Sequence, residues 1–209
     1  MKAAIVGAGG IGSPLAQALK ETEGFDGVWI IDGDHVQRSN LPRQPWYTAD
    51  TLGDNKAEAL AAVLGAPFHA VHSFVDAQFN WPDLDIIFDA SDNWPARLAI
   101  QDAARRMHIP WIFSSAVRWE GQSAFMSPDG PCLACLFGET LTEGLRCFEA
   151  GVVGFVTLAT AGQALDLFLR WRENPEDPEL RRLHLLEGRQ GLKWSVGFPP
   201  GRCQHGMVQ

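Results

Sequence analysis

The feature that most constrains the fold is a glycine-rich stretch directly after the first apolar run. The residues 3–6 form a short apolar run of the kind that makes a buried strand, and a helical pattern begins at about Ser13. Between them Gly7, Gly9 and Gly12 stand at G-x-G-x-x-G spacing, with Gly10 inside the loop. Such glycines allow a tight turn, a close approach of backbone to phosphate, and close packing of helix on strand. The helix N-terminus then offers N–H groups and a partial positive charge to an anion.

The next strand supports a nucleotide-binding interpretation of this loop. Residues 28–31 form a second apolar run, and Asp32 follows it twenty residues after Gly12, where a ribose-binding carboxylate belongs. The alternative is a glycine-rich turn without a ligand, which the order strand–glycines–helix–strand–aspartate makes less favourable. We therefore expect an adenine nucleotide or dinucleotide.

Strands and helices alternate along the first half of the chain. This order predicts an α/β fold, a Rossmann-like, mainly parallel sheet with helices on both faces. At 209 residues the chain has the size of one domain, with a nucleotide-binding half over 1–115 and a second half over 116–209. The strands are expected at 2–6, 28–32, 68–74, 85–90 and 109–114, and the helices at 13–22, 55–64 and 94–107, with an irregular stretch over 38–50.

Antiparallel strands are expected to extend the sheet in the second half. Residues 115–119 and 122–126 flank Glu120-Gly121 as in a hairpin, and 183–187 and 192–196 suggest a second antiparallel pair. A loop is expected to carry Cys132 and Cys135, and a buried helix is expected over about 152–171.

Charge and cysteine content narrow the partners and the compartment. The formal charge of −8 argues against a nucleic-acid backbone or an anionic membrane as the main partner. The four cysteines include one Cys-x-x-Cys pair, which points to metal or thiol chemistry in a reducing compartment rather than to disulfides. We expect a cytoplasmic protein.

Carboxylates and cations gather around the expected ligand crevice. Asp32, Asp34 and Asp92 follow strand ends, and ligands of an open α/β sheet bind outside the carboxyl ends of its strands. Arg43 and Lys56 stand in or just after the segments that close over this crevice. Two cations and a metal-binding carboxylate suit displacement at a phosphate better than hydride transfer. Singly, each also has a simpler interpretation, such as a strand-end cap, a solvated charge or, for Asp92, the cap of the next helix.

Together these motifs resemble the ThiF/MoeB/HesA adenylyltransferases, the bacterial relatives of ubiquitin-activating enzymes. The resemblance runs through nearly the whole chain. It rests on Gly-Ala-Gly-Gly-Ile-Gly-Ser, Asp32-Gly-Asp34, Ser-Asn-Leu-Pro-Arg-Gln at 39–44, Lys56, Ser-Asp-Asn at 91–93, Arg-Trp-Glu-Gly-Gln at 118–122, Cys132-Leu-Ala-Cys135 and Cys-Phe-Glu-Ala-Gly-Val at 147–152.

The resemblance implies an ATP- and Mg²⁺-dependent enzyme that adenylates the C-terminal glycine carboxylate of a ubiquitin-like sulfur carrier ending in Gly-Gly. The acyl-adenylate then accepts sulfur or forms a thioester with a cysteine, and the enzyme is expected to be a homodimer. Asp32 would hold the ribose and Asp92 the Mg²⁺, while Arg97 would brace the helix after Asp92. The phosphates would meet Asn40, Arg43, Gln44 and Lys56, and the glycines, Asp34 and Asn93 complete the expected nucleotide site.

The resemblance also implies a structural zinc, held in relatives by two Cys-x-x-Cys pairs. Here the first pair is intact, whereas the tail reads Cys203-Gln-His205, so His205 is expected to replace the missing cysteine. The alternative is a vestigial site with free thiols. Cys147 stands where some members carry a cysteine that bonds to the carrier, and it is either catalytic or an inert loop thiol.

Two other functions stay open, and one of them follows from a departure from the family pattern. Members usually carry a segment before the first strand with an arginine that completes an ATP site, and Lys2 is no evident substitute for it. A catalytically inactive carrier-docking module would tolerate this departure. An NAD-dependent oxidoreductase would share the glycine loop and Asp32, but it would not need Arg43, Lys56 and Asp92 together.

Overall fold

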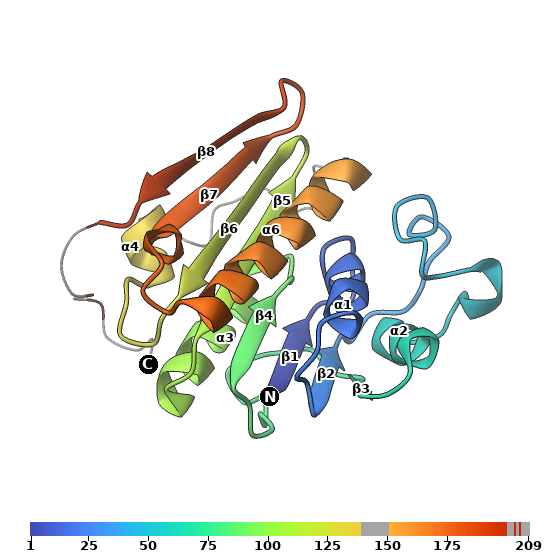
Figure 1. Cartoon of the computed structure of the whole chain (residues 1–209). Helices are drawn as coiled ribbons and strands as arrows, with labels where there is room; N and C mark the ends of the chain where they lie inside the picture. Colours follow the sequence, from blue (N-terminus) through green and yellow to red (C-terminus); the bar gives the residue numbers. More distant parts are fainter. Residues whose placement is uncertain (139–150, 200–202, 204, 206–209) are drawn as a thin grey trace.

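A mixed β-sheet runs through the computed structural model, which describes residues 1–138, 151–199, 203 and 205 (Figure 1). Within these residues the sheet has eight strands in the order β3-β2-β1-β4-β5-β6-β7-β8. Strands β1 to β5 pair in parallel and β5 to β8 pair antiparallel, which confirms the predicted fold class. The strands are β1 Lys2–Val6, β2 Gly27–Ile31, β3 Phe68–Val71, β4 Ile86–Asp89, β5 Trp111–Val117, β6 Glu120–Met126, β7 Arg182–Glu187 and β8 Leu192–Gly197.

Helices cover both faces of this sheet. One face packs against α1, α2 and α6, and the other packs against α3 and α4. The helices are α1 Gly12–Lys20, α2 Lys56–Leu64, α3 Trp94–Met107, α4 Leu133–Phe137 and α6 Gly154–Glu173, with 3₁₀ turns at Ala49–Thr51 and Pro178–Arg181. Among the described residues, none of the helices combines the length and apolar character needed to cross a bilayer.

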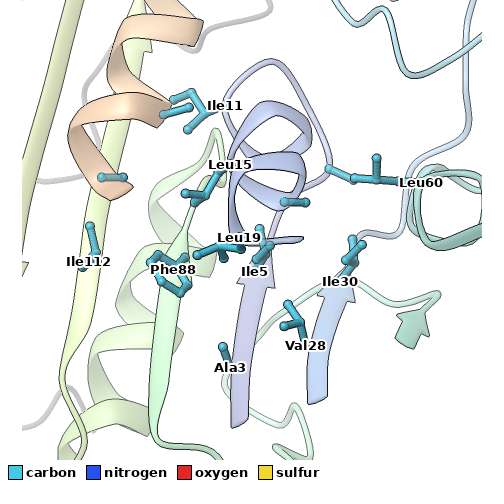
Figure 2. Packing of buried hydrophobic residues seen from close by; sticks show 14 of the residues in the cluster. Ala3, Ile5, Ile11, Leu15, Leu19, Val28, Ile30, Leu60, Phe88 and Ile112 are labelled. Carbon is cyan, nitrogen blue, oxygen red and sulfur yellow. The ribbon is translucent and has the colours of Figure 1, made fainter. Parts of the chain in front are cut away.

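Side-chain alternation along the strands divides the core into two layers. Figure 2 shows Leu15 and Leu19 of α1 lying over Ile5 and Phe88, which point to the same face of the sheet. Their neighbours Ala4 and Ile87 turn to the opposite face and pack under α3. All six side chains are almost fully buried. Burial of each large one contributes about 1.5–3 kcal/mol, so this packing fixes the end of β1 from which the glycine loop starts.

The hairpin between β5 and β6 turns two residues earlier than predicted. We expected Glu120-Gly121 to be the turn, but Val117 pairs with Glu120 and the turn is Arg118-Trp119, with Arg118 at a φ of 53°. Gly121 lies inside β6 under α6, where a Cβ would overlap the hydroxyl of Thr160. The glycine is therefore explained by close packing of helix on sheet, not by a turn. The expected strands at 109–114 and 115–119 form the single strand β5.

Other differences concern the ends of elements. The strand expected over 68–74 ends at Val71, and the buried helix begins at Gly154 rather than near 152. The loop expected to carry the first cysteine pair contains the short helix α4, which begins after Cys132. Cys147 lies outside the described residues.

Candidate active site and metal centre

A cavity of about 850 Å³ lies at the carboxyl ends of the parallel strands. It lies where the strand order reverses between β2-β1 and β1-β4, which is where doubly wound sheets bind ligands. The cavity gathers nearly all of the predicted nucleotide-site residues, namely Gly7, Gly9, Gly10, Asp32, Asp34, Asn40, Arg43, Gln44, Lys56, Asp92 and Asn93.

The glycine loop enters the cavity in a conformation that side chains would not permit. Gly7 has a φ of 97°, and a Cβ there would lie 2.5 Å from the carbonyl oxygen of Ala90. A Cβ on Gly12 would overlap the carbonyl oxygen of Gly7. Gly12 does not line the cavity, so its role is to let α1 begin close against β1.

Asp32 joins the glycine loop to the loop after β2. Its two carboxylate oxygens accept hydrogen bonds from the backbone N–H of Ala8, at 2.7 Å, and of Asp34, at 2.8 Å. Burial raises the pKa of Asp32, while the nearby charge of Lys56 and the two N–H bonds act in the opposite direction. The carboxylate retains free lone pairs, so it is able to accept hydrogen bonds from ribose hydroxyls.

The two predicted cations both have protein partners. Lys56 Nζ lies 2.8 Å from the carboxylate of Asp34, and the lysine side chain is largely buried. The Arg43 guanidinium donates to the carbonyl oxygen of Ser39. Lys56 is oriented by the start of α2, where the side chain of Asn55 accepts from the N–H of Glu58 and donates to the carbonyl oxygens of Asp32 and Asp34.

Two predicted amide side chains differ in what they do. Asn40 is buried, and its Oδ1 accepts a hydrogen bond from the N–H of Gln37, so it shapes the loop. Gln44 is only 3% exposed, yet its Oε1 has no hydrogen-bond partner within the described residues. A buried amide without a partner is costly, so Gln44 is the amide better prepared to bind a ligand in the cavity.

Asp92 is exposed at the cavity, and its neighbour Asn93 takes the capping role. Asn93 is the N-cap of α3 and accepts from the N–H of Ala96 at 3.0 Å, so the interpretation of Asp92 as the helix cap is wrong. Arg97 donates to the carbonyl oxygen of Ser91 at 2.9 Å, as expected of a residue that braces this turn. Its guanidinium also lies 3.5 Å from Asp89, a fully buried carboxylate that we did not predict. Burial raises the pKa of Asp89, and Arg97 opposes this.

The second cluster brings together the four predicted zinc ligands. His205 Nδ1 lies 3.4 Å from Cys132 Sγ, 3.3 Å from Cys135 Sγ and 3.9 Å from Cys203 Sγ. All four donor atoms lie within 4.8 Å of one another. A tetrahedral zinc with ordinary Zn–S and Zn–N bonds holds its donors about 3.6–3.8 Å apart, so small side-chain adjustments would bring these four donors to a zinc ion.

Arg105 of α3 supplies positive charge to this cluster. Although burial raises the pKa of the Cys203 thiol, hydrogen bonds from Arg105 and Cys132 lower it overall. Three thiolates and a neutral imidazole around a bound Zn²⁺ would carry one net negative charge, which the Arg105 guanidinium would offset.

Sequence reasoning missed two residues of the first site. Tyr47 donates from its buried hydroxyl to the carbonyl oxygen of Ala8 at 2.7 Å. Phe74 lines the cavity beside Gly33. Tyr47 is the single tyrosine of the chain, which is the one signal that could have singled it out. Nothing in the pattern around Phe74 indicates a site.

The fold is a doubly wound α/β domain with an antiparallel extension, and its cavity lies where such sheets bind ligands. The comparisons with known proteins are more specific. The model of the ThiF family matches residues 1–194. The chain therefore belongs to the ThiF family.

Several named proteins are similar to this chain. The chain is 37% identical to the SAMP-activating enzyme E1 of Haloferax volcanii over 160 residues, which are 72% of this chain and 59% of that protein. It is 34% identical to the sulfur carrier protein adenylyltransferase of Thermus thermophilus over 185 residues, which are 79% and 68% of the two chains. The structure of E. coli MccB superposes with a TM-score of 0.81 at 18% identity, covering 97% of this chain and 65% of that one. The likeness to MccB shows the fold.

Proposed function

We propose that this domain uses ATP to adenylate the C-terminal glycine carboxylate of a ubiquitin-like sulfur-carrier protein. The observation that carries the proposal is that one cavity is lined by the glycine loop together with Arg43, Lys56 and Asp92. Two of the relatives are named as an activating enzyme and a sulfur carrier protein adenylyltransferase, which supports the same chemistry. The chain spans 59% of the first of these, so the activity of the whole relative is part of the proposal.

In the proposed reaction a carrier carboxylate oxygen attacks the α-phosphorus of ATP. The bond from that phosphorus to the bridging oxygen breaks, pyrophosphate leaves, and an acyl-adenylate forms. Arg43 and Lys56 stabilise the negative charge that accumulates on the phosphoryl oxygens. Lys56 must exchange its contact with Asp34 for a phosphate, and the exposed Asp34 carboxylate is readily solvated when it is released. Asp32 binds the ribose, while Gln44, Asn40 and the glycine loop position the phosphates.

Asp92 is proposed to hold Mg²⁺. Carboxylate oxygens are the ligands that this ion prefers, and Asp92 lies at the cavity with Asn93 taking the capping role beside it. The ion, when bound, would neutralise phosphate charge. The cavity is lined by three carboxylates, Asp32, Asp34 and Asp92, and by only two cations. The protein alone therefore does not neutralise the negative charge of a triphosphate.

Zinc is proposed as a structural ion at Cys132, Cys135, Cys203 and His205, because their four donor atoms lie within 4.8 Å of one another and are of the kinds that zinc prefers. Such thiolates suit a reducing compartment, so a cytoplasmic location belongs to the proposal. Cys147 remains a candidate for the thioester step, and the described residues do not include it.

The carrier is proposed to dock on the open face of β7 and β8. Leu192, Trp194 and Val196 are each about half exposed on one side of β8. Val196 lies opposite Leu183 of β7, and Leu183 packs on the face that α3 and α4 cover elsewhere. An apolar surface at the edge of the sheet, formed by alternate residues of one strand, is typical of a protein-binding face.

A homodimer is also proposed. Phe155, Leu158 and Leu169 are 47%, 51% and 43% exposed, and their spacing places them along one side of α6. Gly162 lies between them with open space around it, which would let a second helix approach closely.

Exchange of pyrophosphate into ATP, measured with candidate carriers that end in Gly-Gly, tests the proposed reaction. The exchange should require the carrier and should be abolished by Asp92→Ala, with the fold retained. Glu58→Ala is the matched control, because Glu58 is an exposed carboxylate in the first turn of another helix. Exchange at wild-type rate in Asp92→Ala would remove Asp92 from the reaction. Binding of NAD in preference to ATP would favour an oxidoreductase, and binding of carrier without exchange would favour an inactive docking module.

A further inference from the structure

Phe74 is an exposed aromatic side chain at the edge of the cavity. It is 66% exposed, more than any other large apolar residue that is exposed in the described part of the chain. It belongs to neither hydrophobic cluster. Burial in the core therefore does not explain why a phenylalanine stands there.

The ring nevertheless has a fixed place. A Cβ added to Gly33 would lie 2.6–2.7 Å from three ring atoms of Phe74, so the ring rests against the bare backbone of Gly33. Gly33 directly follows Asp32, and Phe74 follows the end of β3, the strand that pairs with β2. One side of the ring is thus supported by backbone while most of its surface remains open.

The place of the ring relative to Asp32 suggests its ligand. Asp32, Gly33 and Phe74 line the same cavity. In a nucleotide the base is attached to the ribose carbon next to the one that bears the 2′-hydroxyl. A carboxylate that binds the ribose hydroxyls must therefore have the base within a few bond lengths, and the flat apolar surface next to Asp32 is the ring of Phe74.

We propose that Phe74 stacks on the nucleotide base and makes the cavity selective for purines over pyrimidines. The inference rests on the proposed nucleotide-binding role of the cavity. Stacking gains with the area of the two ring systems, and every base has a π-face, so a ring of this kind favours the larger bases without reading their edges. Phe74 then contributes to ATP and GTP affinity alike, whereas the phosphate-binding residues act on any triphosphate.

The test compares wild type, Phe74→Ala and Phe74→Trp by calorimetric titration with ATP, GTP, CTP and inorganic tripolyphosphate, each with Mg²⁺. Loss of a stacking partner should raise the Kd for ATP and GTP by about tenfold in Phe74→Ala. The Kd for CTP should rise less, the Kd for tripolyphosphate should not change, and Phe74→Trp should restore purine binding. Val63→Ala is the matched control, because Val63 is a 53% exposed apolar residue of α2 that does not line the cavity.

The outcomes separate this inference from the proposed function. An ATP Kd in Phe74→Ala within twofold of wild type would overturn the stacking role, as would an equal loss for tripolyphosphate or no ATP binding by wild type. Purine binding that depends on Phe74, in a protein that does not exchange pyrophosphate with any carrier, would support the stacking role while the adenylation proposal fails. Carrier-dependent exchange with an unchanged KM for ATP in Phe74→Ala would support the adenylation proposal while the stacking role fails.

Discussion

The hydroxyl of Tyr47 donates a 2.7 Å hydrogen bond to the carbonyl oxygen of Ala8, in the middle of the glycine loop. The same hydroxyl lies 3.2 Å from the carbonyl oxygen of Lys56, at the start of α2. The Ser13 hydroxyl also donates to the carbonyl oxygen of Ala8, and the Asp32 carboxylate accepts a hydrogen bond from the N–H of Ala8. Both backbone polar groups of Ala8, its N–H and its carbonyl, are thus hydrogen-bonded within the protein, which orders the glycine loop. Tyr47 also links this loop to α2, the helix that begins at Lys56.

Tyr47→Phe should weaken ATP binding while keeping the fold. Loss of one buried hydrogen bond lowers the free energy of unfolding by about 1 kcal/mol, and Ser13 still satisfies the Ala8 carbonyl. Burial raises the pKa of Tyr47, so its hydroxyl remains a donor across the ordinary pH range. Chemical unfolding and ATP titration of the variant measure the two effects. Unchanged affinity together with a loss of stability would reduce Tyr47 to a purely structural role.

The contrast between Asp32 and Tyr47 shows what the sequence could predict. The glycine loop, Asp32 and the strand–helix alternation are local patterns, and each appears in the structure where it was expected. Tyr47 and Ala8 are 39 positions apart in the sequence, and Tyr47 stands in an irregular stretch with no periodicity, so no local pattern predicts their hydrogen bond. Gly121 was misplaced for a related reason, because a glycine required by a helix 39 positions later looks the same in the sequence as a glycine required by a turn.

ATP with Mg²⁺ should stabilise the protein against heat more than NAD at equal concentration. Arg43 and Lys56 both line the cavity, and together they match a triphosphate better than the two phosphates of a dinucleotide. Stabilisation follows the logarithm of ligand excess over Kd and reaches about 2.7 kcal/mol at a hundredfold excess. Thermal unfolding with each ligand measures the difference. Greater stabilisation by NAD would contradict the adenylyltransferase interpretation.

Because of Asp32, a fall in pH should raise the stability of the fold while it lowers the affinity for ATP. Burial raises its folded pKa above the unfolded value, so the folded protein takes up the proton first as pH falls. The contribution of Asp32 to stability therefore rises as pH falls through the folded pKa toward the ordinary value of 3.8. ATP affinity should fall over the same range, because the protonated carboxyl is a poorer acceptor for ribose hydroxyls. Asp32→Asn cannot titrate, so the difference between wild type and this variant in unfolding and binding, followed with pH, isolates the effect. If the difference between wild type and Asp32→Asn did not change with pH, Asp32 would not be the group that titrates over this range.

Trp194→Ala should impair use of the carrier without affecting ATP. Trp194 is 48% exposed on the proposed docking face, so its loss removes contact area for a protein partner and leaves the cavity intact. The kcat/KM for the carrier in pyrophosphate exchange should fall by about tenfold, which is typical when an aromatic anchor is removed from an interface. Lys193→Ala is the matched control, since Lys193 is the adjacent residue of β8 and points to the other face. Equal effects of the two variants would place the carrier elsewhere.

Purified protein should contain about one zinc per chain. Cys203 and His205 lie near the C-terminal end of the sequence, whereas Cys132 is the N-cap of α4 and Cys135 lies within it. The ion would therefore join the C-terminal segment to α4. His205→Ala should lower zinc affinity, because three thiolates then lack the fourth donor of a tetrahedral site, whereas Cys147→Ala should not. Chelation should expose the chain beyond Gly197 to protease before residues 1–115 unfold, because the metal's contribution to folding is local to the residues that it joins. Metal-free protein that resists protease as well as the zinc-loaded form would show that the four side chains hold the C-terminal segment without an ion.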